Sequence, residues 1–317
     1  MAGITPRWEW RTFGTRFARA EAVFSGLEAT GVQFSPVFML ARDRAGHLRQ
    51  FLDEMAAASD PAALATVGKE THRLWVIEAG RYEMRRIAPL LSETFTIADG
   101  HHRYETAVNY KAKRLEADGS LPRDHPARFT LAAVVPADDP GLVIRPIHRI
   151  VPRTAPEDWL GTLSANFVIE PVVGDPSAGE MTELMTHHPG FVMALGLDSP
   201  DSMHWLVPMD ATAMAPAGHD AAWAALGSNV LRYGVLEPLW GIGDEELRSG
   251  AVEFTHLASD VVERVAAGGA TGFLLTAVTA TDTLALAELG ERMPQKSTFF
   301  HPKMATGLVF YPLNPSG

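Results

Sequence analysis

Residues 94–119 contain the feature that most constrains how this chain can fold. Thr94–Ala98 is a short apolar run typical of a strand, and the turn dipeptide Asp99-Gly100 follows it directly. Beyond the turn, apolar residues recur at helical spacing, and neither glycine nor proline interrupts the run before Gly119. The sequence therefore predicts a strand, a tight turn and a long helix, in that order.

The turn brings charged side chains to the start of that helix. A helix begins with unpaired backbone N–H groups at the positive end of its dipole, and together these attract anions. His101, His102 and Arg103 add side-chain donors, and a guanidinium can bind one phosphate through two hydrogen bonds. Two interpretations follow from the residues: the turn binds phosphate, or Asp99 merely caps the helix while the histidines face solvent.

Two long blocks of the sequence resemble one protein family. The string IADGHHRYETA, at 97–107, resembles the signature of a bacterial and archaeal family catalogued as domain of unknown function 1015. The string RMPQKSTFFHPK, at 292–303, with TGLV at 306–309, is similar to a block near the C-terminus of that family. Weaker matches lie at Ser35–Phe38, Leu74-Trp75 and Arg145–Arg149. On these residues the chain is identified as a member of the family.

The DGHHR core of the first block also resembles the phosphate loop of the ParB/sulfiredoxin superfamily, which includes the archaeal free serine kinases. Family members usually carry a further segment with a Pro-Pro-Tyr-Asp-Val motif ahead of the position of Ser35–Phe38, and that motif does not occur here. In the serine kinases, a catalytic acid and part of the nucleotide pocket precede the loop. The resemblance therefore implies a phosphate-loop domain that is shortened at its N-terminus.

The length of 317 residues favours two domains, and the pattern of predicted strands and helices favours an α+β architecture. The resemblance implies a ParB/sulfiredoxin-like domain over residues 21–153, and alternating strand and helix patterns predict a second, mixed α/β domain over 154–317. Residues 1–20 have no assignment. We expect hairpins that pair 128–136 with 142–151 and 296–300 with 307–313, and helices at 47–58, 80–91 and 221–239.

Composition excludes several classes of protein. A formal net charge of −11 is unfavourable for nucleic-acid binding, which depends on lysine and arginine to neutralise phosphates. The absence of cysteine excludes disulfides and thiol chemistry. The N-terminus does not resemble a signal peptide, and the longest apolar stretch, near 272–280, is too short to span a bilayer. We expect a cytoplasmic protein that binds neither nucleic acid nor membrane, and the sequence does not predict its oligomeric state.

Two further groups of residues could bind an anion. Lys296, Ser297, Thr298 and Lys303 place two ammonium and two hydroxyl groups within eight residues. A strand with alternate residues facing solvent is the other interpretation, and the family resemblance favours the anion site. For His148-Arg149, a surface strand and a binding role stay equally open.

A metal-dependent hydrolase is a third possibility, because the chain has twelve histidines. Two adjacent pairs occur, His101-His102 and His187-His188, but neighbouring residues on one element point in different directions. No HExxH or HxH motif is present, so structural roles are favoured for these histidines.

The resemblance implies a nucleotide-dependent phosphotransferase that uses ADP or ATP with Mg²⁺ and acts on a small hydroxylated metabolite such as serine. We expect Arg103 and Lys296 to neutralise phosphate charge and Asp99 to hold Mg²⁺. His102 would orient the transferring group and Glu78 would act as a base. The other predicted cofactor-binding residues are Gly100, His101, His148, Arg149, Ser297, Thr298 and Lys303. A nucleotide- or phosphate-binding regulatory protein without turnover and a phosphate-ester hydrolase are the alternatives.

Overall fold

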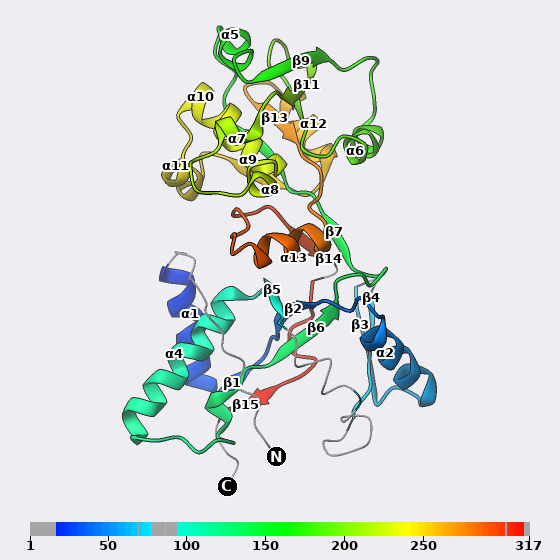
Figure 1. Cartoon of the computed structure of the whole chain (residues 1–317), viewed down its shortest axis with the longest axis vertical. Helices are drawn as coiled ribbons and strands as arrows, with labels where there is room; N and C mark the ends of the chain where they lie inside the picture. Colours follow the sequence, from blue (N-terminus) through cyan, green and yellow to red (C-terminus); the bar gives the residue numbers. More distant parts are fainter. Residues whose placement is uncertain (1–16, 69, 78–85, 87–93, 302, 314–317) are drawn as a thin grey trace. The chain divides into compact units, whose positions relative to one another are not determined.

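The computed structural model describes residues 17–68, 70–77, 86, 94–301 and 303–313. The chain divides into two compact units (Figure 1). Unit 1 comprises Met1–Leu142 and Pro302–Gly317, and unit 2 comprises Val143–His301. The chain therefore leaves unit 1 once and returns to it near its C-terminus, and each unit is described separately below.

The centre of unit 1 is a three-stranded sheet in the order β5-β2-β6. The middle strand, β2 (Val37–Ala41), is apolar and buried at four of its five positions, as expected for a strand covered on both faces. It pairs antiparallel with β5 (Thr96–Asp99) and parallel with β6 (Ala132–Pro136). The candidate turn at Asp99 thus begins at the end of a sheet strand.

Three α-helices, one short 3₁₀-helix and two small strand pairs complete the described part of unit 1. In Figure 1, α1 and α4 run beside each other, and Leu27 of α1 and Tyr110 of α4 belong to one apolar cluster with Leu313. Strand β1 pairs with β15, which joins the C-terminal segment to this unit. The bounds are α1 (Phe17–Thr30), β1 (Val32–Gln33), α2 (His47–Ala58), β3 (Ala63–Val67), β4 (Glu70–Leu74), α4 (His101–Asp118), η2 (Pro126–Arg128) and β15 (Tyr311–Pro312).

Unit 2 is built on a six-stranded antiparallel sheet in the order β12-β8-β13-β10-β11-β9. Alternate residues of one strand face opposite sides, so Val192 and Ala194 join one core cluster while Met193 and Leu195 join another. Both faces of the sheet are therefore covered. The strands are β8 (His148–Val151), β9 (Phe167–Pro171), β10 (Val192–Leu195), β11 (Met203–Pro208), β12 (Glu253–Thr255) and β13 (Thr271–Leu274).

Helices supply the residues that cover this sheet. Val261 and Val265 of α12 pack against one face, and Val230 and Leu236 of α9 and η3 pack against the other. A separate two-stranded ribbon joins β7 (Val143–Arg145) to β14 (Phe299–His301). The helices are α5 (Trp159–Leu163), α6 (Ala178–Thr186), α7 (Ala211–Met214), α8 (Ala221–Ala224), α9 (Gly227–Leu231), the π-helix η3 (Arg232–Leu236), α10 (Glu237–Trp240), α11 (Asp244–Ser249), α12 (Ala258–Ala266) and α13 (Ala280–Glu288).

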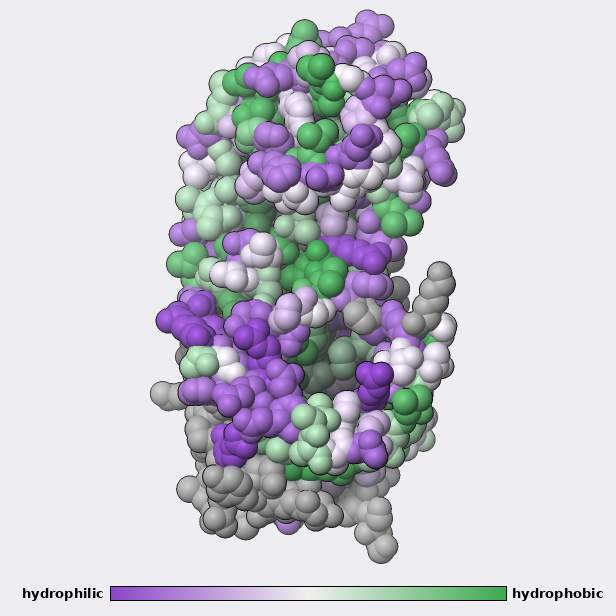
Figure 2. Space-filling model, turned by 90° about the vertical axis from the view of Figure 1, so that its right-hand side faces the viewer, coloured by the Kyte–Doolittle hydropathy of each residue, from purple (hydrophilic) through white to green (hydrophobic). Residues whose placement is uncertain are grey.

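The surface of each unit is mixed in polarity. On the faces drawn in Figure 2, apolar residues are interspersed with hydrophilic residues in both units, as is usual for a protein surface that faces water. None of the described helices is both long enough and apolar enough to cross a membrane.

The predicted α+β class and the helix at 47–58 are confirmed, but both predicted hairpins are wrong. Strand β6 pairs with β2, whereas β8, buried at every position, is an interior strand of unit 2. In the C-terminal region, β14 pairs with β7 and β15 with β1.

Two other predictions differ from the structure in extent. The chain passes from unit 1 to unit 2 between Leu142 and Val143 rather than near residue 153, so β7 and β8 both belong to unit 2. The predicted long helix over 221–239 is divided into α8, α9, η3 and α10. The helix expected at 80–91 lies outside the described residues except for Arg86.

Candidate functional site

The turn between β5 and α4 has a local geometry that requires glycine. Gly100 is the N-cap residue of α4 and has φ 91°, a left-handed conformation that other residues rarely adopt. A Cβ atom at this position would lie 2.7 Å from Nη2 of Arg103. The guanidinium of Arg103 therefore lies against the backbone of the turn, and the missing side chain of Gly100 provides the space for it.

Asp99 is the centre of a small ionic cluster at this turn. Its Oδ1 accepts a hydrogen bond from the Gly100 N–H at 2.8 Å, and its Oδ2 accepts one from Nζ of Lys303 at 3.1 Å. Nη2 of Arg103 lies 3.8 Å from the same Oδ2. Lys303 is 204 residues away in the sequence but belongs to the same unit. Two cations and one carboxylate thus meet at the positive end of an 18-residue helix.

These contacts determine the charge state of Asp99. Burial alone would raise the pKa of its carboxyl group, but the charges of Lys303 and Arg103 and the hydrogen bonds from Lys303 and Gly100 outweigh it. The pKa therefore lies below its ordinary value, and Asp99 is ionised at neutral pH. Its Oδ1 accepts from the N–H of Gly100, the N-cap residue of α4, while its Oδ2 faces the two cations, so Asp99 contacts both the start of the helix and the ionic cluster.

The two histidines of the turn have different surroundings. Burial lowers the pKa of His101, although the carboxylates of Asp99 and Glu105 oppose this effect. His101 is therefore neutral at pH 7. Nδ1 of His102 lies 3.7 Å from Oε2 of Glu105 in the next turn of α4. The imidazole of His102 thus has a carboxylate on one side.

The His148-Arg149 pair lies in the interior of unit 2. His148 is 1% exposed and Arg149 is 4% exposed, so the interpretation as a surface strand is wrong. Nδ1 of His148 accepts a hydrogen bond from the Leu275 N–H, and burial together with the Arg149 charge lowers the pKa of His148 to about 4. Burial likewise lowers the pKa of Arg149 to about 9. Both side chains are held inside the sheet.

The KSTFFHPK block is divided between the two units. Lys296, Ser297 and Thr298 belong to unit 2, and Lys303 belongs to unit 1. The Lys296 carbonyl accepts a hydrogen bond from Nη2 of Arg149 at 2.7 Å, so two separately predicted groups meet within unit 2. That Lys296 and Arg103 bind one ligand stays a prediction. Glu78 lies outside the described residues.

Asp99 does not offer a suitable Mg²⁺ site by itself. Both of its carboxylate oxygens already accept hydrogen bonds, and two cations lie within 4 Å of Oδ2. Among the described residues, no group of three or more His, Cys, Asp or Glu side chains could hold a metal ion. Mg²⁺ usually takes one or two carboxylates together with substrate phosphates, so we assign no chemical step to a metal bound by Asp99.

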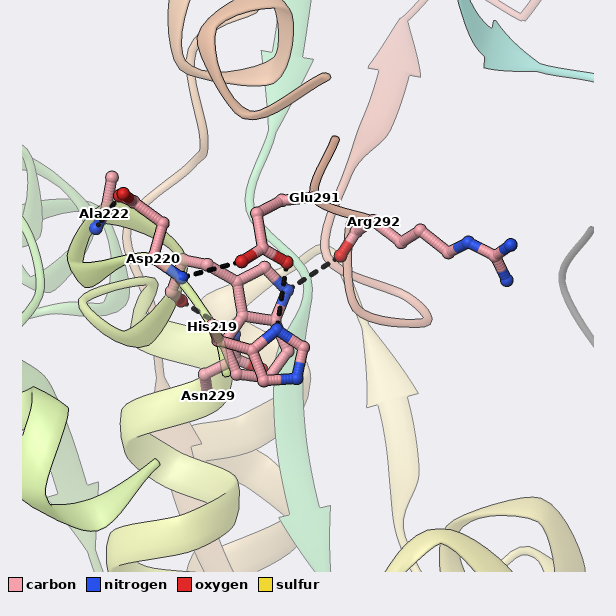
Figure 3. Close-up of polar contacts among 7 residues, drawn as sticks. His219, Asp220, Ala222, Asn229, Glu291 and Arg292 are labelled. Atoms are coloured by element: carbon pink, nitrogen blue, oxygen red, sulfur yellow. Dashed lines mark hydrogen bonds and ion pairs between the residues drawn. The ribbon is translucent and has the colours of Figure 1, made fainter. Parts of the chain in front are cut away.

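A polar cluster in unit 2 has no counterpart in the sequence-based predictions (Figure 3). The Glu291 carboxylate contacts Nδ1 of His219 at 2.9 Å and accepts a hydrogen bond from the Asp220 N–H at 2.6 Å. Trp223 stacks on His219 and donates from its Nε1 to the Arg292 carbonyl at 2.8 Å. The cluster attaches the chain segment at Glu291 and Arg292, which precedes Lys296 in the sequence. Asp220 is recognisable in the sequence as the N-cap of α8, but its pairing with Glu291 is not.

Comparisons with known proteins place the chain in a family. The model of a family described as a protein of unknown function, DUF1015, matches residues 14–215. No curated protein sequence matches the chain.

Several solved structures have partial similarity to the fold. A free serine kinase variant in complex with ADP is 14% identical, with a TM-score of 0.41 over 90% of this chain and 81% of its own. A conserved hypothetical protein from Pyrococcus furiosus is 13% identical, with a TM-score of 0.41 over 93% and 88%. A C-terminally truncated SbnI from Staphylococcus aureus is 14% identical, with a TM-score of 0.41 over 94% and 81%.

Proposed function

The chain belongs to the DUF1015 family, and we propose that it is a nucleotide-dependent phosphotransferase whose phosphate site is the turn at the start of α4. The observation that carries this proposal is the meeting of Arg103 and Lys303 at Asp99, beside the Gly100 turn. Two cations at a helix start form an arrangement that suits a phosphate group. The Asp99 carboxylate holds both cations in place when no phosphate is bound.

Phosphoryl transfer depends mainly on positioning and charge neutralisation. In the proposed reaction, the bond from the transferred phosphorus to the bridging oxygen of ADP or ATP breaks. A new bond forms to the hydroxyl oxygen of a small metabolite such as serine, and the hydroxyl proton passes to a base, for which Glu78 is our candidate. Arg103 and Lys303 neutralise the charge on the phosphate oxygens, and His102 orients the transferred group.

The direct test is to look for a phosphorylated product. The protein is incubated with ADP or ATP and a panel of hydroxylated amino acids and amino alcohols, and products are identified by mass spectrometry. We expect one acceptor to be phosphorylated, with a loss of activity of at least about 10-fold in both Arg103→Ala and Lys303→Ala. Arg123→Ala, which changes an exposed arginine beyond the other end of α4, is the matched control and should keep full activity.

A second function has one observation in its favour. Two carboxylates at the start of α4 already have neighbours: Asp99 accepts a hydrogen bond from Lys303, and Oε2 of Glu105 lies 3.7 Å from Nδ1 of His102. A site without an available base would bind a nucleotide or phosphate without turnover. Nucleotide affinity that depends on Arg103, combined with no product from any acceptor, would favour this regulatory function. Phosphate release without an acceptor would instead favour hydrolysis.

A further inference from the structure

The C-terminal segment of unit 1 exposes a run of apolar side chains. Leu308, Val309 and Phe310 are consecutive and exposed, and the ring of Phe34 lies against that of Phe310. Phe310 is 55% exposed and Phe34 is 40% exposed. Single exposed apolar residues are common on protein surfaces, whereas a contiguous group of them often marks a binding site. These four residues are called the apolar patch below.

Hydrogen bonds fix the backbone on both sides of the apolar patch. Ahead of it, the Gly307 N–H donates to the Phe34 carbonyl at 2.9 Å, and the hydroxyl oxygens of Thr306 and Ser35 lie 2.8 Å apart. Gly307 has φ 85°, and a Cβ atom there would lie 3.8 Å from Cζ of Phe310. After the patch, β15 pairs with β1. The exposed rings are therefore carried by a backbone that is anchored at both ends.

The apolar patch belongs to the same unit as the proposed phosphate site and is connected to it along two segments. Lys303, which donates to Asp99, lies on the segment that leads to Leu308. Phe34 precedes Phe38 by four residues, and Phe38 pairs with Asp99 in the central sheet. Four residues of extended chain span at most about 14 Å. The ribose and diphosphate of a nucleotide span a distance of this order, so one nucleotide can reach both places.

The two phenylalanine rings have an arrangement that suits a planar ligand. The ring centroids of Phe34 and Phe310 are 5.5 Å apart, and the ring planes meet at 89°. In such a T-shaped pair, the ring that contributes its edge keeps both of its faces clear of its partner. Nucleobases stack on exposed aromatic rings, because every base has a π-face. A flat ring beside two phosphate-binding cations is the chemistry that a nucleotide requires.

We propose that the apolar patch is the nucleobase site of the nucleotide whose phosphates bind at the start of α4, with Phe34 and Phe310 as the stacking residues. The inference rests on the proposed function for the location of the phosphates. It gives a ligand contact to a segment that the sequence suggests only as half of a hairpin. The base covers the exposed rings, while Arg103 and Lys303 hold the phosphates.

The test compares a ligand that has a base with one that lacks it. ADP and pyrophosphate are titrated into the full-length protein by calorimetry. Phe310→Ala and Phe34→Ala should each bind ADP roughly 10-fold more weakly, because they remove a stacking surface, and should bind pyrophosphate like the wild type. Leu64→Ala removes an exposed apolar side chain from β3 in the same unit, and this control should keep both affinities.

Two further variants distinguish a lost base contact from a folding defect. Phe310→Leu keeps an apolar side chain without a π-face, so it should lose affinity for ADP but not for pyrophosphate, with an unchanged melting temperature. Phe310→Trp keeps a stacking surface and should bind ADP like the wild type. Equal ADP affinity in the wild type, Phe310→Leu and Phe310→Trp would overturn the proposal.

A second copy of this chain is the other occupant that the test can reveal. If the apolar patch forms a dimer interface, sedimentation velocity should show a dimer that Phe310→Ala dissociates, while the affinity for ADP stays at the wild-type value. That result would overturn the nucleobase site. We expect instead that Phe310→Ala leaves the sedimentation coefficient unchanged.

Arg103→Ala separates this inference from the proposed function. It removes a phosphate contact, so it should weaken the binding of ADP and of pyrophosphate alike. A loss in Arg103→Ala with wild-type ADP affinity in the two phenylalanine→alanine variants overturns the nucleobase site and leaves the phosphate site intact. Wild-type affinities in Arg103→Ala, with ADP affinity lost in the phenylalanine variants, overturn the phosphate site and leave the nucleobase site. If the wild-type protein binds neither ligand, both proposals are wrong.

Discussion

The dipeptide His-Arg occurs at both candidate positions, as His102-Arg103 in unit 1 and His148-Arg149 in unit 2, but in opposite environments. The Arg103 side chain is 27% exposed at the start of a helix, where it shares Asp99 with Lys303. Arg149 is 4% exposed within an interior strand and donates to two carbonyl groups. One arginine can exchange its partners for a ligand, and the other cannot do so without opening the sheet.

The difference shows that residue type does not determine role. A partly exposed guanidinium near a single carboxylate leaves donors that can bind phosphate. A buried guanidinium must satisfy its donors within the protein, since an unpaired buried charge is costly. The first arrangement suits a ligand contact, and the second suits a structural support.

The largest effect that the comparison of Arg103 with Arg149 predicts is on the free energy of unfolding. Arg149→Ala leaves the carbonyls of Ile147 and Lys296 unpaired and creates a cavity, so we expect a loss of about 3 kcal/mol in the free energy of unfolding. Arg103→Ala alters a half-exposed ion pair and should cost no more than about 1 kcal/mol. Urea unfolding of both variants measures the contrast. Equal losses would show that the two environments do not differ as described.

The pH dependence of stability should be dominated by the buried histidine. The folded-state pKa of His148 is about 4 and the ordinary value is 6.5, so the unfolded chain binds this proton more readily. The contribution of His148 to the free energy of unfolding is therefore fully present above pH 6.5. It is lost as the pH falls towards 4, by a total of about 3 kcal/mol.

His148→Gln tests this pH effect. The glutamine amide does not titrate, and its oxygen can accept the Leu275 N–H in place of Nδ1. We expect urea unfolding of this variant to show a flatter pH profile between 6.5 and 4. His47→Gln, at an exposed position, provides the control for replacing a histidine with glutamine. If the stability of His148→Gln depended on pH as steeply as that of the wild type, another group would be responsible for the effect.

The smallest expected effect comes from two glycine variants. Their comparison distinguishes a general effect of backbone strain from a specific effect on the ligand site in unit 1. Gly100→Ala and Gly119→Ala both place a side chain at positive φ, 91° and 71°, at the two ends of α4. Each should lose about 1–2 kcal/mol of stability. The added Cβ meets the Arg103 guanidinium at Gly100 but has open space around it at Gly119. Phosphate affinity should therefore fall in Gly100→Ala alone, and a parallel fall in Gly119→Ala would indicate a general effect of strain.

Local signals were sufficient to predict the elements around the turn. The spacing of apolar residues and the Asp99-Gly100 dipeptide predict β5, the turn and α4, because these depend on residues that are close in the sequence. The limits of α2 were likewise predictable. By contrast, the four residues of β8 give no indication of their partners. Pairing with β12 and β13 depends on residues more than 100 positions later.

The candidate site shows the same limit. The sequence singles out Lys296 and Lys303 as neighbours in one basic block, but it does not reveal that the two lysines belong to different units. It identifies Arg149 as a basic residue, but its burial depends on the whole sheet. Non-local packing determines both features, and residue spacing carries no information about it.

The central claim is that the turn at Asp99–Arg103 binds phosphate, and a calorimetric titration tests it most directly. ADP and inorganic phosphate are titrated into the wild-type protein, Arg103→Ala and the control Arg123→Ala. A charge-assisted hydrogen bond contributes about 1.5–3 kcal/mol, so Arg103→Ala should bind roughly 10- to 100-fold more weakly while the control binds like the wild type. Equal affinity in the wild type and Arg103→Ala would remove this turn from the binding site and contradict the account.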